Sequence, residues 1–537
     1  MKKFALLSVS NRDGIVEFAR GLIELGFSLL TTSGTQRFLS DQGLVTCSIA
    51  EYTGQHEILG GRVKTLHPKI HAGILAKRSE STHQAELQAH DIPFIDVVAV
   101  NLYPFEEQLK NAEDKTLEEM IEFIDIGGPT MIRAAAKNCE SVYAVIEPSD
   151  YGTVLEALAQ GSSFEQEDST LLELRLQLSQ KVFTQLAHYN LEISKYLSSQ
   201  AVERSRKEYV SNGLLRSQGQ IWREAQSLRY GENPHQSASL YRKAAGVQQN
   251  AGAGWRQLGG KELSYNNILD ADAGYRLTRM LSTQCSRFSE GEVVSIMKHL
   301  TPCGVAVAAS QDEALRRAKK SDPRSHFGGI IGFSSEVTEA AAREVVADFA
   351  EIVIAPRFSE EALEVFSKRS NLRLLECDYT IPIAGEIRST LFGYLEQTPD
   401  LMSCSIHDGE VVSGALQDLQ LQQDLELAWS VVAHVKSNAI VLVKSQQLIG
   451  SGAGQTSRID SVEVALYKAK EHGHDVAGAV AASDAFFPFP DSLERLVEAG
   501  VRAVVTPNGS KKDSDVIETA NQLGITLIFV PERHFRH

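Results

Sequence analysis

The chain lacks the cysteine patterns of zinc ribbons and dithiol redox sites, because none of its six cysteines falls in a CxxC spacing. They are scattered at Cys47, Cys139, Cys285, Cys303, Cys377 and Cys404. This distribution gives no zinc or disulfide framework and suits a reducing compartment. Long apolar runs are lacking too: no stretch approaches the roughly 20 apolar residues of a membrane helix, and the N-terminal run is too short for a signal peptide. We therefore expect a cytoplasmic protein that binds no membrane.

An excess of basic residues is also missing. The chain has 53 Lys and Arg against 69 Asp and Glu, a formal net charge of −16, so we expect no nucleic-acid partner. A phosphate group would have to be bound by a local cluster of cations. No Walker-type lysine loop occurs, which leaves ATP chemistry without support. The length of 537 residues suggests about three to four units of ~150 residues.

The N-terminal part alternates strand-like and helical segments. The clearest strand-like segments are residues 4–9, 27–30, 95–100 and 142–146. Strands rich in β-branched residues that alternate with helices predict βαβ units and a Rossmann-like, mostly parallel sheet. Helical periodicity over 171–197, followed by a polar stretch, predicts a helical connector that ends near residue 200.

Polar clusters follow these strands, where ligands of parallel α/β sheets bind. They are Ser10-Asn11-Arg12, Thr32-Ser33-Gly34-Thr35, Asn101-Leu102-Tyr103-Pro104 and Asp125-Ile126-Gly127-Gly128-Pro129. Small hydroxyl residues and glycines before a helix expose backbone N–H groups that suit a phosphate. Arg62 and Lys64 would lie on one side of an extended segment and add positive charge. Each cluster alone is better explained by helix capping and turns, but several at strand ends together favour an anionic ligand.

The C-terminal part contains a lysine and a histidine side by side, Lys298-His299, between two apolar runs. We expect a strand over 293–297, then a turn containing Pro302 and Gly304, and a second run from Gly304. Loop ends on a sheet often carry catalytic groups, although a solvated strand edge is the commoner explanation of such a pair. A Ser-Asp pair with a phenylalanine close behind occurs at 321 and again at 483, in each case expected after a strand. This echo suggests two related α/β halves.

Longer motifs carry a resemblance to a known family. They include residues 60–68 (GGRVKTLHP), 101–105 (NLYPF), 125–129 (DIGGP), 133–138 (RAAAKN), 229–234 (RYGENP), 298–299 (KH) and 321–329 (SDPRSHFGG). The chain resembles the bifunctional purine biosynthesis family, which joins an IMP cyclohydrolase to an aminoimidazole carboxamide ribotide formyltransferase.

The resemblance implies a fold and a set of ligands. Residues 1–199 would form a methylglyoxal-synthase-like α/β domain with its helical connector, and residues 200–537 two cytidine-deaminase-like α/β subdomains. The co-substrate would be 10-formyltetrahydrofolate, without a catalytic metal. The family also implies a homodimer whose transferase sites lie at the subunit interface.

The resemblance further implies residue roles. In the transferase, His299 would act as base or relay, and Lys298 would stabilise the oxyanion or protonate the folate leaving nitrogen. In the cyclohydrolase, Lys64 and Tyr103 would polarise the formyl oxygen, while Asp125 and Lys137 would handle the amide proton. The implied substrate-binding residues are Ser10, Arg12, Thr32, Ser33, Gly34, Thr35, Arg62, Thr65, Asn101, Ile126 and Gly127 in the first domain and Arg229, Tyr230, Phe327, Gly328, Glu351 and Asn438 in the second. The implied folate and phosphate contacts are Arg458, Phe486 and Arg533.

Several points stay open at this stage. If residues 129–138 form one straight helix, its ends lie ~15 Å apart, which separates Asp125 from Lys137. The chain also departs from the family pattern: Arg12 replaces a usual lysine, Ser33 stands where glycine is common, and His326 beside Phe327 could bring a second imidazole to the pocket. Two competing hypotheses are a pyridoxal phosphate enzyme with Lys298 as the Schiff-base lysine, and a nucleotide sensor without cyclising activity.

Overall fold

The computed structural model describes most of the chain. The described residues are 3–103, 105–109, 115–160, 169–204, 210–211, 214–215, 219–243, 254–285, 291–383, 385–416 and 418–537. Pro104, part of a predicted motif, lies outside these ranges. The chain divides into two compact units: unit 1 comprises Met1–Glu224 and Tyr241–Gln249, and unit 2 comprises Ala225–Leu240 and Asn250–His537. The boundary after residue 199 stays a prediction, and each unit is described by itself below.

Unit 1 is built on a parallel sheet of five strands in the order β3-β2-β1-β4-β5. The strands are β1 (Lys3–Ser8), β2 (Phe27–Thr31), β3 (Cys47–Ser48), β4 (Ile95–Val100) and β5 (Tyr143–Val145). The prediction of a parallel α/β sheet is therefore confirmed. Strand β4 is buried along its whole length, as expected of a central strand covered on both faces.

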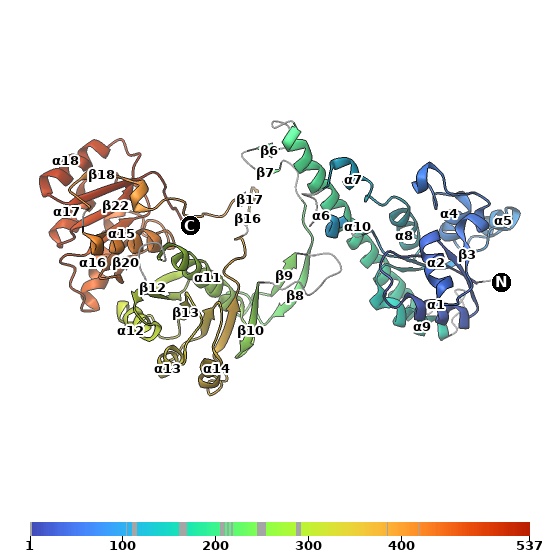
Figure 1. Cartoon of the computed structure of the whole chain (residues 1–537), viewed down its shortest axis with the longest axis horizontal. Coiled ribbons are helices and arrows are strands. Elements are labelled where there is room, and N and C mark those ends of the chain that lie inside the picture. Colours follow the sequence, from blue (N-terminus) through green and yellow to red (C-terminus); the bar gives the residue numbers. More distant parts are fainter. Residues whose placement is uncertain are drawn as a thin grey trace. The chain divides into compact units, whose positions relative to one another are not determined.

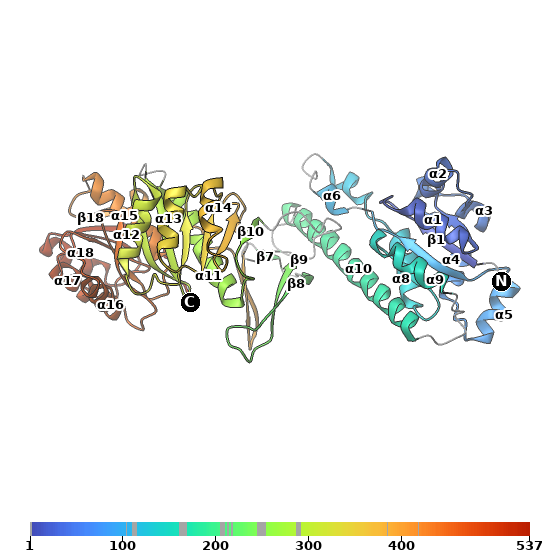
Figure 2. The same cartoon turned by 90° about the horizontal axis from the view of Figure 1, so that it is seen from below.

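Helices cover both faces of this sheet (Figures 1 and 2). Helices α1 (Ile15–Glu24) and α9 (Tyr151–Ala159) share one buried apolar cluster with the sheet, while α4 (Pro68–Leu75) and α8 (Gly127–Lys137) share the other. The remaining helices are α2 (Ser33–Asp41), α3 (Ile49–Thr53), η1 (Leu59–Gly61), α5 (Ser81–Ala89), α6 (Phe105–Leu109), α7 (Leu117–Ile121), η3 (Pro148–Asp150) and the 36-residue α10 (Ser169–Arg204). Helix α10 packs on α8 and β5 through Val182 and Leu186, which explains its helical periodicity.

Unit 2 is built on a mixed sheet of 12 strands. In spatial order they are β10 (Trp255–Gly259), β15 (Arg373–Cys377), β14 (Ile352–Ala355), β13 (Ile330–Phe333), β11 (Glu292–Lys298), β12 (Thr301–Ala308), β20 (Gln447–Gly452), β19 (Ile440–Lys444), β21 (Val480–Ser483), β22 (Ala503–Pro507), β23 (Thr526–Val530) and β18 (Glu410–Ser413). Outside the two large sheets, two-stranded pairs are β6 (Val210–Ser211) with β7 (Leu214–Leu215) in unit 1, β16 (Glu386–Thr390) with β17 (Gly393–Gln397) in unit 2, and β8 (Trp222–Leu228) with β9 (Ala238–Lys243).

The large sheet consists of two halves with the same plan. Each half has an antiparallel hairpin followed by three parallel strands: β11–β12 with β13, β14 and β15, and β19–β20 with β21, β22 and β23. The halves meet where β12 pairs with β20 at Ala306 and Gln447. This repeat confirms the expectation of two α/β subdomains.

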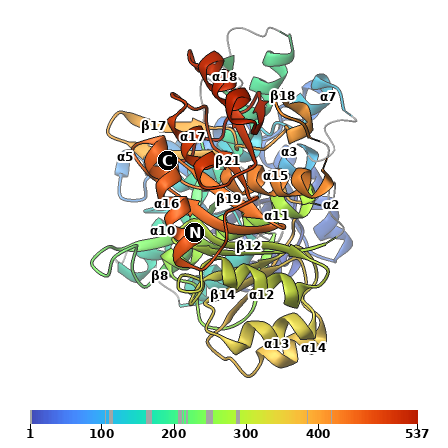
Figure 3. The same ribbon diagram turned by 90° about the vertical axis from the view of Figure 1, so that its left-hand side faces the viewer.

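Helices cover each half in a matching way (Figure 3). Helices α12 (Gln311–Ser321), α13 (Glu339–Ala347) and α14 (Glu360–Phe366) pack on the first half, and α16 (Arg458–Glu471), α17 (Asp491–Glu498) and α18 (Asp513–Leu523) on the second. Helices α11 (Tyr265–Cys285) and α15 (Leu419–Val432) share one apolar cluster on the opposite face. The short helix η4 (Ile406–Asp408) precedes β18.

Two local predictions in unit 2 are wrong. Ser321 ends helix α12 whereas Ser483 ends strand β21, so the Ser-Asp echo does not fall at equivalent places in the two halves. The turn expected around Pro302 and Gly304 is part of strand β12. The register of β11 and β12 shifts beside Pro302, and such an irregularity accommodates a residue without an N–H group.

Candidate active sites

The carboxyl ends of β1 and β4 in unit 1 are tied together by one amide side chain. Asn101, just after β4, accepts hydrogen bonds from the backbone N–H groups of Ser10 and Asn11 at its Oδ1 atom. Its Nδ2 atom donates to the Asn11 carbonyl over 3.0 Å. The structure thus brings together Ser10 and Asn101, which the sequence placed on separate strand ends.

Helix α2 starts at the same edge of the sheet. Thr32 precedes its first residue, Ser33, in an extended conformation, and the first turn contains no acidic residue. Thr35 in this turn is buried and accepts a hydrogen bond from the backbone of Val9 over 3.1 Å. Ser33 and Gly34 are exposed at the helix start, where backbone N–H groups and the helix dipole favour a phosphate. Ser33 is the first residue of α2 and does not have a positive φ angle, so this position does not require glycine; its hydroxyl donates a hydrogen bond to Glu57.

A carboxyl group and an ammonium group lie beside the start of α8. Asp125 accepts a hydrogen bond from the Gly128 N–H at 3.1 Å, and the Tyr189 hydroxyl accepts one from the Asp125 N–H at 2.7 Å. Burial raises the pKa of Asp125, while the glycine N–H groups and the Lys64 charge act in the opposite direction. Lys64 Nζ is 3.5 Å from Glu57 Oε2. A carboxyl group with a raised pKa next to a lysine is suited to proton transfer.

The other residues predicted around the Asp125 carboxyl are either exposed or packed against the start of α8. Thr65 is buried and packs against Gly127, where an added Cβ atom would lie 2.5 Å from its hydroxyl oxygen. Tyr103 is exposed and stacks on Phe123 with ring centroids 5.8 Å apart. Ile126 is exposed as well.

Three predicted cations of unit 1 are not gathered at Asp125. Helix α8 runs without interruption from Gly127 to Lys137, so Lys137 stands at the opposite end, roughly 15 Å along the axis. Arg62 is paired with Glu122, and the Arg12 guanidinium lies 4.6 Å from the Phe38 ring centroid. The catalytic role of Lys137 therefore stays a prediction that this geometry does not support.

In unit 2, the Lys298-His299 pair forms the tip of the hairpin β11–β12. His299 and Leu300 are the two turn residues, and both have positive φ angles, 50° and 61°. Non-glycine residues at positive φ are uncommon, and they concentrate where a side chain has a functional task. Lys298 Nζ donates a 2.6 Å hydrogen bond to the carbonyl oxygen of Phe327. On the other side of the turn, Leu300 N donates to Asp270 Oδ1 over 2.9 Å.

This tip opens onto a cavity of about 280 Å³. Its lining residues are Lys298, His299, Thr301, Pro302, Cys303, Ser321, Asp322, Ser325, Leu448, Gly450, Ser451, Ala453, Lys468 and His472. Asp322 belongs to a motif that the sequence singled out, whereas Lys468 and His472 on the α16 side carried no sequence signal. His326, the departure that could have added an imidazole, bonds instead to the Asp322 carbonyl at 3.3 Å and is not part of the lining.

The predicted ligand contacts of unit 2 lie in several environments. Gly328 has a φ of 71°, which favours glycine, and its N–H donates to the Phe349 carbonyl. Glu351 Oε2 forms a 2.7 Å ion pair with Arg373. The Arg229 guanidinium lies 5.6 Å from the Tyr230 ring centroid.

The predicted folate contacts are partly buried. Arg458 is 6% exposed, pairs with the fully buried Asp484 and donates to Asn438 Oδ1 over 2.8 Å. Phe486 is half-buried. Arg533 is exposed at the C-terminal segment. Arg458 and Asn438 are thus joined in one hydrogen-bonded cluster.

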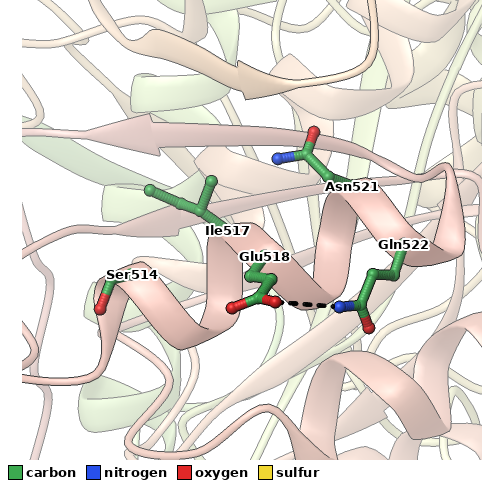
Figure 4. Close-up of a pocket in the computed structure, with 5 residues that line it drawn as sticks. All are labelled: Ser514, Ile517, Glu518, Asn521 and Gln522. Carbon is green, nitrogen blue, oxygen red and sulfur yellow. Dashed lines mark hydrogen bonds between the residues drawn. The ribbon is translucent and has the colours of Figure 1, made fainter.

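A second hollow, of about 650 Å³, lies on the outer face of α18 (Figure 4). Five residues of this single helix line it, and Gln522 donates to Glu518 over 3.1 Å. None of the predicted site residues is among them. In the described part of the chain, no group of three or more His, Cys, Asp or Glu side chains is placed to hold a metal ion. Among the described helices, none is long and apolar enough to span a membrane.

Comparisons with known proteins agree with a chain that combines two enzymatic parts. Residues 14–130 match the family described as the MGS-like domain, and residues 135–468 match the AICARFT/IMPCHase bienzyme family. The chain belongs to the AICARFT/IMPCHase bienzyme family. It is 42% identical over 539 aligned residues to the bifunctional purine biosynthesis protein PurH of Oceanobacillus iheyensis, with 100% of both chains covered. A solved structure titled "Crystal structure of ForH" is 36% identical over 36% of this chain and 97% of its own, with a TM-score of 0.31.

Proposed function

We propose that the two activities of this bifunctional enzyme are divided between the two units. The chain is a phosphoribosylaminoimidazolecarboxamide formyltransferase and an IMP cyclohydrolase of purine biosynthesis. Formyl transfer is assigned to the tip of β11–β12, and ring closure to the strand ends of unit 1. The observation that carries the first assignment is the 2.6 Å bond from Lys298 to the Phe327 carbonyl.

In formyl transfer, Lys298 stabilises charge and His299 moves a proton. An ammonium has three donors, and Lys298 makes this one hydrogen bond among the described residues, so donors remain for a substrate oxygen. The aromatic amine of the ribotide attacks the formyl carbon while His299 accepts the amine proton. Lys298 stabilises the oxyanion of the tetrahedral intermediate. The carbon–nitrogen bond to the donor then breaks, and the donor nitrogen takes up a proton. The donor we propose is 10-formyltetrahydrofolate, with Arg458, Phe486 and Arg533 as its expected contacts.

In ring closure, the residues around Asp125 activate the formylated ribotide. Lys64 and Tyr103 polarise the formyl oxygen, and the Asp125 carboxylate accepts the proton of the attacking carboxamide nitrogen. A carbon–nitrogen bond forms and the carbon–oxygen bond breaks. The formyl oxygen leaves as water, which carries away one proton from the carboxamide nitrogen and one from the formamido nitrogen, and no cofactor takes part. The phosphate is placed at the start of α2.

A homodimer is also proposed, and an exposed apolar hairpin supports it. The strands β16 and β17 are exposed at every residue, and their turn residues Leu391 and Phe392 are 94% and 97% exposed. Tyr394 is 78% exposed beside them. Large apolar side chains grouped in this way mark an interaction surface. A cytoplasmic location is proposed with it.

A coupled assay tests the proposed function. The purified full chain is mixed with aminoimidazole carboxamide ribotide and 10-formyltetrahydrofolate, and IMP is followed over time. From aminoimidazole carboxamide ribotide, IMP should accumulate only when 10-formyltetrahydrofolate is also present. In a separate reaction, the formylated ribotide should yield IMP without the folate. A pyridoxal chromophore in the absorbance spectrum would support the Schiff-base hypothesis instead, and IMP binding without any turnover would support the sensor hypothesis.

A further inference from the structure

Residues 471–474, at and just after the end of α16, contact the end of α12 and the loop that precedes β13. Two imidazoles bind successive carbonyl oxygens at the end of α12: His472 Nδ1 lies 3.0 Å from the Ser321 oxygen, and His474 Nε2 lies 2.9 Å from the Lys320 oxygen. Arg324 in the loop donates to Glu471 over 3.0 Å. These contacts join the two halves of unit 2 at a place where the sheet itself makes only one pairing.

The two nitrogens of the His472 ring face different groups: Nδ1 is hydrogen-bonded, and Nε2 lies close to two carboxylates without a hydrogen bond to any described residue. The Ser321 carbonyl can only accept, so Nδ1 must carry the hydrogen of that bond. Nε2 lies 3.4 Å from Asp322 Oδ1 and 3.8 Å from Glu471 Oε2, which are carboxylate oxygens. The side chain of His472 is 4% exposed, so water cannot readily take the place of these partners. The ring thus bridges the Ser321 carbonyl and the carboxylate of Asp322.

Asp322 in turn orders the loop 322–329. Its Oδ1 atom accepts hydrogen bonds from the backbone N–H groups of Arg324, at 3.1 Å, and Ser325, at 2.9 Å. Burial by itself would raise the pKa of Asp322, but the bonds from Ser325 and the neighbouring His472 and Lys468 charges together lower it. The carboxylate is thus held ionised in the position that fixes this turn.

The same loop ends in the group that holds Lys298. Phe327 lies two residues after Ser325, and its carbonyl accepts the Lys298 hydrogen bond. A continuous series of contacts therefore runs from His472 through Asp322 and the loop backbone to the Lys298 ammonium. His472, Asp322 and Lys298 also line the same cavity of about 280 Å³.

We propose that His472 is a positioning residue for formyl transfer, which acts through Asp322 and the loop 322–329 to place the Lys298 ammonium. The inference rests on the proposed role of Lys298. Without the contact between His472 and Asp322, the loop 322–329 is less firmly held. The Phe327 carbonyl, and Lys298 with it, can then move away from the developing oxyanion. Phe327 and Gly328 belong to this loop, but the other expected substrate contacts, Arg229, Tyr230, Glu351 and Asn438, lie outside it, so turnover should suffer more than substrate affinity.

The test compares His472→Gln, Asp322→Asn and the double variant in the full chain. Misplacement of a catalytic group by a fraction of an ångström to 1 Å lowers rates by about 10- to 100-fold. We expect His472→Gln to lower kcat of formyl transfer about tenfold with the KM for the ribotide within about twofold. Asp322→Asn should have a similar effect. The kcat of the double variant should be no lower than that of the less active single variant, because both residues act in one unit.

A matched control separates positioning from general anchoring. His474→Gln changes an imidazole at the same helix end that also binds a backbone carbonyl, but His474 does not contact Asp322 and does not line the cavity. Its formyl-transfer kcat should stay within about twofold of the wild type. Equal losses in His474→Gln and His472→Gln, multiplied losses in the double variant, or an unchanged kcat in His472→Gln would each overturn the proposal.

A second measurement keeps the test independent of turnover. The rate at which an amine-directed reagent modifies Lys298, followed by mass spectrometry, should rise in His472→Gln and stay unchanged in His474→Gln. An unchanged rate in a folded His472→Gln protein would contradict the proposal. Lys298→Met distinguishes the two levels of inference: if it retains formyl transfer, the proposed site fails, whereas an inactive Lys298→Met beside a normal His472→Gln overturns the positioning role alone.

Discussion

The two hairpins of unit 2 have the same backbone but different chemistry. The turn of β11–β12 reads Lys298-His299-Leu300-Thr301, and the turn of β19–β20 reads Lys444-Ser445-Gln446-Gln447, with positive φ at both central residues of each. Each turn is also held by an aspartate from the helix on the opposite face, Asp270 from α11 and Asp424 from α15. The repeat therefore extends to the lysine that precedes each turn.

The difference lies in what each lysine does. Lys444 donates to three acceptors, namely Asp475 Oδ2 at 2.9 Å, the Asp475 carbonyl at 3.1 Å and the Ala477 carbonyl at 2.7 Å. Its three donors are used up within the protein. Within the described ranges, Lys298 donates to one carbonyl, and the residue after it is a histidine rather than a serine. One hairpin thus has a satisfied structural lysine, and the other has a lysine with donors left for a ligand.

Replacing each lysine by methionine should break the comparison most clearly. Lys298→Met removes the group assigned to the oxyanion, so formyl transfer should fall by about 10²- to 10³-fold. Lys444→Met should leave formyl transfer within about twofold and reduce the free energy of unfolding by only ~0.5 kcal/mol, since the ion pair is at the surface. Initial rates of formyl transfer and urea unfolding measure the two effects. Similar losses of rate in both variants would show that the hairpins do not differ in function.

The residue after each lysine provides the next test. His299→Ala should lower formyl transfer by about 10²- to 10⁴-fold, the usual contribution of a general base, while Ser445→Ala should not change it. Cyclisation of supplied formylated ribotide should proceed at the wild-type rate in both variants, because ring closure is assigned to unit 1. If a folded His299→Ala protein lost both activities, the division into two sites would be wrong.

Much of this arrangement could be predicted from the sequence, and the exceptions have physical causes. Alternating apolar strands and helices predicted the parallel sheet of unit 1, and the polar residues after β1 and β4 do meet at Asn101. Strand β3 has only two residues and left no periodic signal. The turn at His299 was missed because such turns normally carry asparagine or glycine, whereas the neighbouring Pro302 and Gly304 suggested a turn that the structure does not have.

The partners of Lys298 and His299 in the proposed transferase site were harder to foresee. His472 and Asp322 are 150 positions apart and meet because α12 and α16 pack next to adjoining strands of the two halves. A lone histidine on a helix gives no pattern from which such a contact could be derived. The expected separation of Lys137 from Asp125, in contrast, followed from the rise per residue of a helix alone. The uninterrupted helix α8 agrees with that separation.

The aspartates that hold the two turns should differ in stability rather than in rate. Asp424 is 1% exposed, and its two oxygens accept the N–H groups of Ser445, at 2.8 Å, and Gln446, at 2.6 Å. Asp424→Asn would set an amide NH₂ against one of these donors, which should lower the free energy of unfolding by ~1–3 kcal/mol. Asp270→Asn keeps the one oxygen that Leu300 needs and should cost less than ~1 kcal/mol. Urea unfolding of both variants checks the order, and a larger loss in Asp270→Asn would contradict it.

The pH dependence of the Asp424→Asn effect has a defined sign. Burial raises the pKa of Asp424 above 3.8, although the N–H groups of Gln446 and Ser445 oppose this. The folded state then binds the proton more tightly than the unfolded state, so this group stabilises the wild type as the pH falls through its folded pKa. The stability deficit of Asp424→Asn should therefore widen on acidification. Unfolding curves at neutral pH and near pH 4 test this, and a deficit that shrinks would refute it.

The smallest expected effect concerns the second turn residue of each hairpin. Leu300 and Gln446 have φ angles of 61° and 56°, in the left-handed region that costs an L-residue ~1–2 kcal/mol and costs glycine almost nothing. Glycine also loses ~0.5–1 kcal/mol through the entropy of the unfolded chain. The two backbone effects leave a gain of about 0–1.5 kcal/mol for Leu300→Gly, and the lost packing of the leucine side chain, which is 42% exposed, reduces it further. Gln446→Gly should be near neutral, because the side chain also loses a 3.2 Å bond to Gln423.

The two glycine variants should differ in activity even though they change the same backbone position. A glycine after His299 lets the tip of β11–β12 sample more conformations, and the Lys298-His299 pair then spends less time in the reactive arrangement. Formyl transfer should fall about two- to threefold in Leu300→Gly and remain unchanged in Gln446→Gly, with cyclisation unaffected in both. An unchanged rate in Leu300→Gly would mean that the positive φ angle of the non-glycine residue does not contribute to catalysis. The contacts of Lys298 with Phe327 and of Leu300 with Asp270 would then be enough to hold the tip.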